Sequence, residues 1–453
     1  MTDVTVRDMV EKCDCKLLIG NLDEKIEECF VDSKEVKKGG CFFGIKGKNI
    51  DGSLFYKEAF DNGANICVIS KIYDLDLKGY DDKTVLVAKD TLKTLQKIAE
   101  YKRSLFKGEV IGITGSVGKT STKNMIVNIL KNKYKVLTNR KNENSQIGVP
   151  LTIMRLKDEE VIILEMGMSM KGEMHNLSLI AKPTISLITN ILDSHIQNFN
   201  TRENILNAKL EILDYMDKGT LILNNDDSLL SNYNNDNNMN ILKYGILNEG
   251  DITATNIKEN IVTKFDIDEI KDIIVLGGKE FVYNALASIL VARLLKVTDD
   301  DIKQGIITYK NEEHRLQIID LYNNVTLIDD TYNANYDSVM AAVKLISNFK
   351  NRRKIVVLGD ILELGSSSKK IHKKIGKDLA NFKIDMLITV GKYSKLIKRE
   401  YKKKGKRIRI KHFRKELRVR KYLKRNIKKN DVILFKASNG IKLVNLVNYI
   451  KNI

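Results

Sequence analysis

A glycine-rich turn between an apolar run and a helical pattern constrains the fold of this chain more than any other feature. The apolar run "GEVIGITG" leads into "SVGKTSTKNMIVNIL", in which apolar residues recur at helical spacing. A buried strand, a glycine turn and a helix in this order are typical of open parallel sheets, which bind ligands at the carboxyl ends of their strands. Backbone N–H groups at such a turn hold phosphate oxygens. We therefore expect a nucleotide site here.

The loop departs from the strict P-loop pattern, G-x-x-x-x-G-K-[ST], because Ile113 stands at the position of the first glycine. Gly115 and Gly118 precede Lys119 and Thr120, so the physical requirements of the pattern are kept. The lysine can reach the terminal phosphates of a nucleotide, and the threonine hydroxyl can bind Mg²⁺. The alternative is a turn that only packs a strand against a helix.

The length of 453 residues exceeds what one hydrophobic core serves, so two or three domains are expected. In residues 1–105, short apolar runs such as "CFFGI" and "ANICVIS" alternate with turns and two helical stretches, which predicts a small α/β domain. In residues 106–310, "VIILEMG", "PTISLITNI" and "TLILNNDD" predict buried parallel strands, each followed by a helix. In residues 311–453, "NVTLIDDT", "RKIVVLGD", "DMLITVG" and "DVILFKAS" predict a second, Rossmann-like, mostly parallel sheet. The fold class is therefore α/β, in three domains.

Composition favours a cytoplasmic protein. No run of about 18 apolar residues is present, and the N-terminus carries acidic residues where a signal peptide would be apolar. All five cysteines lie in the first 70 residues and form no CxxC pair, so we interpret them as free thiols rather than as a zinc site.

The net charge of +19 has one source. Residues 392–429 contain 20 Lys or Arg against two acidic residues, whereas the rest of the chain contains 57 basic and 56 acidic residues. The segment also contains the strand-like run "IRIKHF", and Leu417, Val419, Tyr422 and Leu423 follow a rough helical spacing, so it is expected to fold. We favour a solvated basic face; steering of an anionic substrate and a nucleic-acid patch are the alternatives.

Polar residues follow the predicted strands of the central section. Glu165 directly follows four apolar residues, and a carboxylate near Thr120 would suit Mg²⁺, although a lone acid is also a common helix cap. His195 follows the next strand, and Lys209 lies on a helix expected to begin after Thr201. Ordinary ligand chemistry does not predict the lysine, because an ammonium repels a cation. Alone, this histidine and this lysine are more typical of structural and surface positions.

These motifs together resemble a known family. The stretches "ITGSVGKTST", "LEMGMSMKGE", "TNILDSHIQNF", "AKLEI", "YNALAS", "HRLQ" and "DDTYNAN" occur in the order found in the Mur ligases, the ATP-dependent amide-forming enzymes of peptidoglycan precursor synthesis. The resemblance spans nearly the whole chain, and the shortened glycine loop is the usual form in this family. It is strongest to the members that add D-alanyl-D-alanine to UDP-N-acetylmuramoyl-tripeptide, through "NRKNENSQIGVPLT", "DDTYNANYDS", "LGDILELG" and "VDSKEVKKGGCFFGIKGKNIDG".

The resemblance implies catalytic roles for Lys119, Glu165, His195 and Lys209, and a metal-binding role for Thr120. Lys119 would bind the ATP phosphates, Thr120 one Mg²⁺, and Glu165 a second Mg²⁺ that His195 completes. Lys209 matches the lysine that is carbamylated in the family, and a carbamate is an anion that can bind metal. The implied cofactors are thus ATP, two Mg²⁺ ions and a carbamylated lysine, and the implied chemistry is amide formation through an acyl phosphate.

The resemblance also implies two sets of binding residues. Those for ATP are Gly115, Ser116, Gly118, Lys119, Thr120, Ser121, Asn284, Arg315, Asp329 or Asp330, and Asn333. Those for the muramoyl-peptide substrate are Asp32, Ser33 and Lys34 at the uridine end, Asn142 and Asn144 in the centre, and Lys436 and Ser438 near the peptide or acyl phosphate. The expected partners are UDP-N-acetylmuramoyl-tripeptide and D-alanyl-D-alanine, with neither nucleic acid nor membrane, and the protein is expected to be a monomer.

Three departures from the family pattern concern substrate contacts. The usual Asp-Ser-Arg is "DSK" here, Tyr336 follows Asn-Ala-Asn where a proline is usual, and the late Lys-Gly-Ser-Arg motif is "KASNG". Asn439 cannot make the bidentate pair that an arginine makes. A sibling amide ligase with another donor or acceptor is therefore one alternative function. A nucleic-acid-dependent P-loop ATPase that uses residues 392–429 is another.

Overall fold

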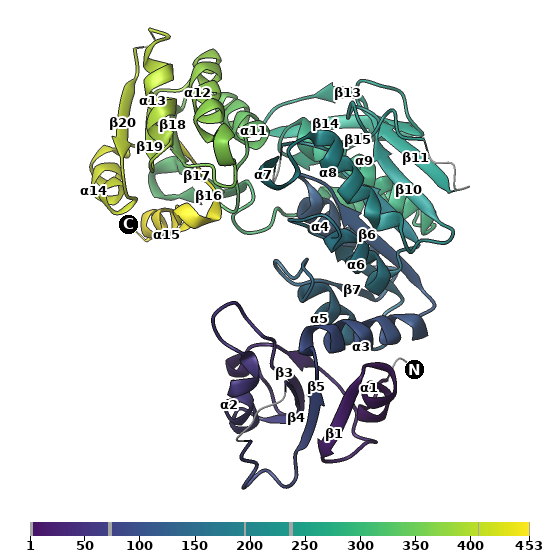
Figure 1. The fold of residues 1–453 in the computed structure, drawn as a ribbon. Coiled ribbons are helices and arrows are strands. Elements are labelled where there is room, and N and C mark those ends of the chain that lie inside the picture. Colours follow the sequence, from purple (N-terminus) through teal and green to yellow (C-terminus); the bar gives the residue numbers. More distant parts are fainter. Residues whose placement is uncertain (1–2, 71–74, 194–195, 235–238, 406, 453) are drawn as a thin grey trace.

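The computed structural model describes residues 3–70, 75–193, 196–234, 239–405 and 407–452. Figure 1 shows three lobes that follow one another along the chain, with the N-terminal lobe at one end of the molecule. Each lobe contains one larger sheet, and the middle lobe also carries a small three-stranded sheet. The α/β fold class predicted from the sequence is confirmed.

The N-terminal lobe has a five-stranded sheet in the order β1-β5-β4-β3-β2, in which only β1 and β5 pair antiparallel. Its strands are β1 (Cys15–Ile19), β2 (Cys29–Phe30), β3 (Gly40–Phe43), β4 (Ala64–Ile69) and β5 (Thr84–Ala88), and its helices are α1 (Val6–Lys12), α2 (Tyr56–Asp61) and α3 (Thr91–Leu105). The five cysteines are buried and free, as predicted.

The middle lobe is built on a seven-stranded parallel sheet in the order β12-β11-β10-β9-β6-β8-β7. Its strands are β6 (Glu109–Thr114), β7 (Val136–Thr138), β8 (Val161–Glu165), β9 (Ile185–Ile188), β10 (Thr220–Asn224), β11 (Asn240–Gly245) and β12 (Ile252–Thr253). Its helices are α4 (Lys119–Leu130), α5 (Gly148–Met154), α6 (Glu173–Ala181), α7 (Ile196–Phe199), α8 (Arg202–Leu210), α9 (Lys279–Leu294) and α10 (Asp299–Ile307). The predicted strand, glycine turn and helix are therefore confirmed as β6 and α4.

Two features of the middle lobe differ from the prediction. In the described residues β10 is followed by turns and then β11 rather than by a helix. Side-chain oxygens of Asn224 and Asp227 accept from the N–H groups of residues 226, 229 and 230, and these local bonds hold the backbone in turns. The antiparallel strands β13 (Thr255–Lys258), β14 (Val262–Ile267) and β15 (Ile270–Leu276) were not predicted. Alternate burial along β14 gives a period of two, which is the signal of a sheet with one face in solvent.

The C-terminal lobe has a six-stranded sheet in the order β16-β17-β21-β18-β19-β20, parallel except for the edge strand β16. Its strands are β16 (Gln317–Leu321), β17 (Val325–Asp330), β18 (Arg353–Gly359), β19 (Met386–Val390), β20 (Arg409–Phe413) and β21 (Asp431–Lys436). Its helices are α11 (Tyr336–Ser347), α12 (Ser368–Asp378), α13 (Ser394–Lys402), α14 (Leu417–Asn426) and α15 (Val444–Lys451). Helices α11 to α13 share one core with the sheet, and α14 and α15 share another, so both faces are covered.

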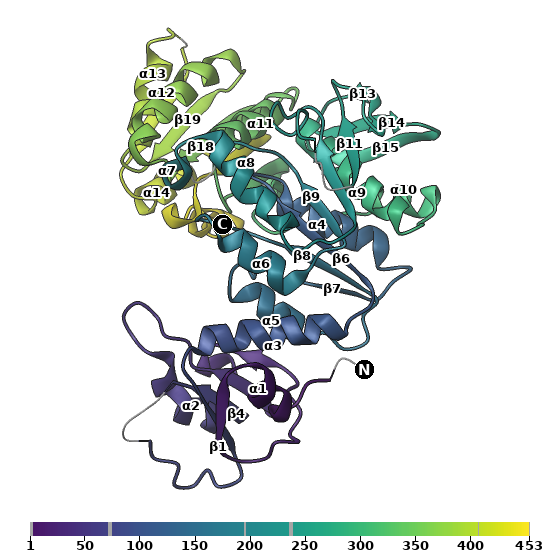
Figure 2. The same ribbon diagram turned by 45° about the vertical axis from the view of Figure 1, so that its right-hand side comes forward.

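Helix α3 joins the first two lobes, and Figure 2 shows it lying beneath α5 and α6. Its buried Lys102 donates to the Met154 carbonyl at 2.8 Å, and Arg103 Nε donates to the Ala181 carbonyl at 2.6 Å. Carbonyl oxygens at the ends of α5 and α6 thus take the place of water as hydrogen-bond acceptors for these buried cations. These bonds fix α3 to the middle lobe. In the part of the chain that the structure describes, no helix is long and apolar enough to cross a membrane.

Candidate active site

A cavity of about 880 Å³ lies between the middle and C-terminal lobes. Its lining comes from the segments that follow β6, β8 and β9 of the middle lobe and β17 and β18 of the C-terminal lobe. These are carboxyl ends of parallel strands, where open α/β sheets bind ligands. Two sheets thus direct their ligand-binding edges into one cavity.

The glycine loop forms one wall of the cavity, and two of its positions require glycine. Gly115 has φ +143°, and a Cβ there would lie 1.9 Å from Thr189 Oγ1. Gly118 has φ +88°, and a Cβ there would lie 2.7 Å from Asn284 Oδ1. Both the backbone conformation and the close neighbours therefore exclude larger side chains at these sites.

The loop is held from the next strand by an asparagine that sequence reasoning did not identify. Asn190 Oδ1 accepts from the Val117 N–H at 3.0 Å, and its side-chain amide donates to the Val117 carbonyl at 3.0 Å. The Ser116 hydroxyl accepts from the Leu192 N–H at 2.9 Å. The signal available in the sequence was the position of Asn190, two residues after β9 ends.

Lys119, Thr120 and Glu165 meet at the start of α4. Thr120 Oγ1 donates to Glu165 Oε2 at 2.6 Å, and the Asn144 amide donates to Glu165 Oε1 at 2.7 Å. Burial acts to raise the pKa of Glu165, but the Lys119 ammonium and these two donors outweigh it and hold the pKa below its ordinary value. The carboxylate is therefore ionised at neutral pH, although its side chain is buried.

The backbone of Glu165 is clamped by Asn139, a second residue that sequence reasoning missed. Asn139 is buried; its Oδ1 accepts from the Glu165 N–H at 2.8 Å, and its amide donates to the carbonyls of Glu165 at 2.9 Å and Glu143 at 2.8 Å. The buried Lys123 donates to the Asn139 carbonyl at 2.8 Å. Asn139 lies within the quoted "NRKNENSQ", but nothing in its spacing distinguished a clamp from a substrate contact.

Lys209 lies in the last turn of α8 and lines the cavity, although it is only 5% exposed. Burial, and then the positive charge of Lys119, lower the pKa of Lys209 well below its ordinary value. The lowered pKa favours the neutral form of the amine, which is the nucleophilic one. His195, the other predicted metal ligand on this side, lies outside the described residues.

The candidate metal site is built on Thr120 and Glu165 rather than on a cluster of acidic residues. No group of three or more His, Cys, Asp or Glu that could hold a metal is found in the ranges the structure describes. The buried pair of a hydroxyl and an ionised carboxylate at Thr120 and Glu165 nevertheless fits the oxygen preference of Mg²⁺. A carbamate on Lys209 would add the anion that the unmodified side chain lacks.

The C-terminal lobe contributes Arg315, Asp330, Asn333 and Lys436 to the cavity lining. The Arg315 guanidinium stacks over the Tyr332 ring at 3.8 Å. The Lys436 ammonium, whose side chain is 2% exposed, pairs with Asp330 at 2.6 Å and donates to the Asn333 carbonyl at 3.0 Å.

The two aspartates that were predicted as alternatives for ATP binding differ in position. Asp330 lines the cavity, whereas Asp329 is wholly buried, accepts from the Thr331 hydroxyl at 2.7 Å and lies 2.7 Å from His314 Nδ1. Of the two, only Asp330 is therefore available to a ligand. The buried Asp329 carboxylate is thus already bonded to a histidine and a hydroxyl of its own lobe.

The remaining predicted residues divide between the cavity and its surroundings. Ser116, Ser121, Asn144 and Asn284 line the cavity, and Asn284 Oδ1 accepts from the Thr122 hydroxyl at 3.2 Å. The residues outside its lining are Asp32, Ser33, Lys34, Asn142 and Ser438.

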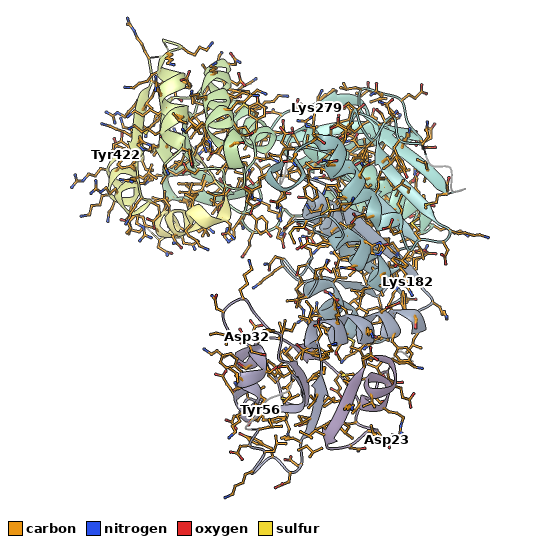
Figure 3. The ribbon with its side chains drawn as sticks, viewed as in Figure 1. Asp23, Asp32, Tyr56, Lys182, Lys279 and Tyr422 are labelled. Carbon is orange, nitrogen blue, oxygen red and sulfur yellow. The ribbon has the colours of Figure 1, made fainter. Side chains whose placement is uncertain are left out.

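The predicted uridine contacts lie in the N-terminal lobe, on the side that faces the other lobes, where Figure 3 labels Asp32. Asp32 caps a short 3₁₀ turn, Ser33–Glu35, by accepting from the Lys34 N–H at 3.0 Å. Ser33 is buried and bonds Glu58, whereas Asp32 and Lys34 are exposed. Binding at this turn and in the cavity would require a ligand that extends across the first two lobes.

The sequence matches two family profiles. Residues 113–292 match the Mur ligase middle domain, and residues 314–439 match the Mur ligase, glutamate ligase domain. The UDP-N-acetylmuramoyl-tripeptide–D-alanyl-D-alanine ligase of Bacillus subtilis is 34% identical, over 92% of this chain and 91% of the relative. The Escherichia coli protein of the same name is 30% identical, over 83% of each chain.

Solved structures give the same assignment. A crystal structure of MurF from Acinetobacter baumannii is 26% identical with a TM-score of 0.87, covering 100% of this chain and 99% of that one. The MurF ligase of Thermotoga maritima in complex with ADP is 28% identical with a TM-score of 0.80, covering 94% and 97%. Together with the cavity built on the glycine loop, these similarities show that the chain belongs to the Mur ligase family.

Proposed function

We propose that this protein joins D-alanyl-D-alanine to UDP-N-acetylmuramoyl-tripeptide at the expense of ATP, in peptidoglycan precursor synthesis. The observation that carries the proposal is the meeting of Lys119, Thr120 and Glu165 beside the buried Lys209 in one cavity. The relatives that share its length carry the name of this activity, and one solved relative was crystallised with ADP.

The reaction would proceed in two steps. A carboxylate oxygen of the tripeptide attacks the γ-phosphorus of ATP, the bond to the β-phosphate oxygen breaks, and ADP leaves. The amine of D-alanyl-D-alanine then attacks the acyl carbon, phosphate leaves, and the amine loses a proton. The first step brings together negatively charged groups, so it depends on cations held in a water-poor site.

The residues of the chain supply part of that charge. Lys119 would bind the phosphates from the loop, and Arg315 would approach them from the C-terminal lobe. Closure of the two lobes around the cavity would also exclude water, which would otherwise hydrolyse the acyl phosphate. The donors at Thr120 and Glu165 would hold Mg²⁺, which offsets phosphate charge when bound.

Lys209 would be carbamylated. Its burial and its lowered pKa support this, because the free amine adds to carbon dioxide only when neutral. As a carbamate the side chain would turn from an amine, which carries no negative charge, into an anion that attracts Mg²⁺. His195, Asn284, Asp330 and the other predicted contacts keep their proposed roles at the metal, the nucleotide and the substrate.

The sections 1–105, 106–310 and 311–453 would then act as the UDP-substrate-binding domain, the ATP-binding domain and the Rossmann-like ligase domain. The turn at Asp32 supports this division, because it lies in a separate lobe, on the side that faces the other lobes. The substrate would extend from this turn, past Asn142, to Lys436 and Ser438.

The test is ATP-dependent phosphate release with Mg²⁺ and UDP-N-acetylmuramoyl-tripeptide, with and without D-alanyl-D-alanine, followed by the mass of the product. We expect release that needs both substrates and a product that carries the dipeptide. Turnover with another amine but not with this dipeptide would assign the protein to a sibling ligase instead.

A second experiment tests the carbamate. Lys209→Ala should abolish turnover, and short carboxylates such as formate or acetate should restore part of it by supplying the missing anion. Lys218→Ala, at an exposed lysine of the same lobe, is the matched control and should behave as wild type. Full turnover of Lys209→Ala without added carboxylate would refute a role for the modified lysine.

A further inference from the structure

The basic segment, residues 392–429, folds at the outer edge of the C-terminal lobe. It supplies α13, the edge strand β20 and α14, and Figure 1 shows these three elements on the side of the lobe that is turned away from α11 and the middle lobe. Helix α13 packs on one face of the sheet and α14 on the other. The positive charge therefore surrounds one free edge of the molecule, which we call the basic edge.

The segment that forms the basic edge contains too few acidic residues to neutralise its positive charge. Its two acidic residues already pair with basic residues of the same helices, Glu400 with Lys403 at 2.8 Å and Glu416 with Arg420 at 3.2 Å. The rest of the chain is nearly balanced, with 57 basic and 56 acidic residues. A general drift of composition toward lysine would have spread over all three lobes, so the concentration at one edge needs a local explanation.

Four lysines of the basic edge crowd together without a counter-ion. Partial burial and the ammonium groups of Lys402, Lys411 and Lys395 lower the pKa of Lys398. In the described part of the chain no carboxylate lies within ion-pair distance of these four groups. Crowded like charges destabilise the protein by themselves, and an anionic partner would remove that cost.

An exposed leucine lies at the start of α14, on the other side of β20 from α13. Leu417, the first residue of α14, is 60% exposed, while the other apolar residues of this helix, Val419 and Leu423, are fully buried. Its neighbours in the chain, Arg414, Lys415 and Arg418, are all exposed. An exposed aliphatic side chain on a basic segment is a feature with which peripheral proteins enter the interface of an anionic membrane.

The aromatic residues of the segment argue against single-stranded nucleic acid as the partner. Tyr401 is buried, and Tyr393, Phe413 and Tyr422 are half-buried; the last two pack on each other with ring centroids 5.5 Å apart. Proteins that bind single strands stack bases on exposed aromatic rings. The basic edge presents lysines and one aliphatic side chain instead.

Two simpler explanations account for only part of the pattern. Lysines on an edge strand prevent pairing with other sheets, which suits Arg409 and Lys411 on β20 but not the cations of α13 and α14. Steering of anionic substrates would require charge at the mouth of the cavity, yet no described residue of the segment lines it.

We propose that the basic edge is a docking surface for an anionic phospholipid membrane, on which Leu417 enters the headgroup layer. This differs from the expectation drawn from the sequence that the protein has no membrane partner, because that expectation concerned segments that span a membrane and a basic surface can bind a membrane without one. Binding here would leave the cavity free, since the basic edge faces away from the middle lobe. The inference does not depend on the reaction assigned to the cavity.

The test is co-sedimentation of the full-length protein with vesicles of phosphatidylcholine that contain phosphatidylglycerol, and with vesicles of phosphatidylcholine alone. We expect binding to the anionic vesicles only, weakened by added salt. Each lysine neutralised should weaken binding roughly fivefold. The variant with Lys395, Lys398, Lys402 and Lys411 changed to glutamine should therefore lose binding, and the variant with the same four changed to arginine should keep it.

The matched control neutralises four exposed lysines elsewhere, Lys16, Lys89, Lys107 and Lys218, and should bind as wild type. A second variant, Leu417→Ala, should bind anionic vesicles more weakly at raised salt, where the apolar contribution dominates. Thermal unfolding and turnover verify that each variant is folded.

Three outcomes would overturn the proposal. These are equal sedimentation of the glutamine variant and wild type, equal binding to both kinds of vesicle, and tighter binding to duplex DNA or RNA than to anionic vesicles at the same salt concentration. The last outcome would replace the membrane by nucleic acid as the partner of the basic edge.

Discussion

Replacing Asn139 by alanine tests whether the clamp on Glu165 holds the site together. The substitution leaves the Glu165 N–H and carbonyl, both at the end of the buried strand β8, without their partners at 2.8 and 2.9 Å. Each buried backbone group left unpaired costs roughly 1–3 kcal/mol. The free energy of unfolding should therefore fall by about 2–6 kcal/mol.

Thermal unfolding measures this loss. In a domain of roughly 150–250 residues, each kcal/mol lowers Tm by about 2–4 °C, so a fall of at least about 4 °C is expected. Turnover should fall at least roughly tenfold, because the Glu165 carboxylate loses its fixed position beside Thr120. Asn142→Ala changes the same residue type at an exposed position of the same loop and should leave Tm unchanged.

The reasoning would be refuted if Asn139→Ala unfolded within about 1 °C of wild type and kept normal turnover. That result would mean that water or another group satisfies the Glu165 backbone. A fall in Tm with normal turnover would limit Asn139 to a structural role and would separate stability from the position of the carboxylate.

Three further substitutions test other parts of the molecule. Gly115→Ala should abolish ATP binding in calorimetry, since its Cβ would meet a side-chain oxygen at 1.9 Å, whereas Gly172→Ala, also at positive φ but with nothing within 4 Å, should keep it. Asp431→Asn should lower the free energy of unfolding by about 2–3 kcal/mol in urea, because the buried carboxylate pairs with Arg353 at 2.6 Å and the partly exposed arginine keeps some hydration. Asp226 has a pKa held below 3.8: burial acts to raise it, but three backbone N–H donors and a tyrosine hydroxyl outweigh this. Asp226→Asn should therefore have a lower free energy of unfolding than wild type, as measured in urea at several pH values. The difference between the two proteins should be largest above pH 3.8 and should decrease as the pH falls below that value.

The residues that sequence reasoning brought together are those at the carboxyl ends of buried strands. Glu165 is the last residue of β8 and the glycine loop follows β6. Because these two strands are neighbours in the parallel sheet, their carboxyl ends lie side by side whatever the conformation of the loops. Lys209 could not be placed by this rule, since it lies on α8, and its proximity to Lys119 depends on how that helix packs. Its proposed role came from the family resemblance, because a lysine in a sequence does not by itself indicate that the side chain is carbamylated.

The clamps were missed for a different physical reason. Asn139 and Asn190 act by bonding backbone groups of other segments, and a side chain that bonds backbone leaves no complementary residue type in the sequence. An ion pair or a metal cluster, in contrast, needs particular partners at particular spacings and so can be sought in the sequence. The antiparallel strands β13 to β15 were not predicted, because continuous apolar runs indicate strands that are buried on both faces. In β14, exposed and buried residues alternate instead.

The clamps also explain why substitutions around the substrate need not disturb the ATP site. Asn139 and Asn190 fix Glu165 and the glycine loop from within the middle lobe, through bonds that involve neither the N-terminal nor the C-terminal lobe. The departures "DSK", Tyr336 and "KASNG" all lie in those other two lobes. Tyr336, for example, directs its hydroxyl to Asp378 at 2.7 Å, within the C-terminal lobe. Because the glycine loop and Glu165 are fixed independently of the outer lobes, changes in those lobes can alter which peptide or amine is bound while this part of the ATP site stays in place.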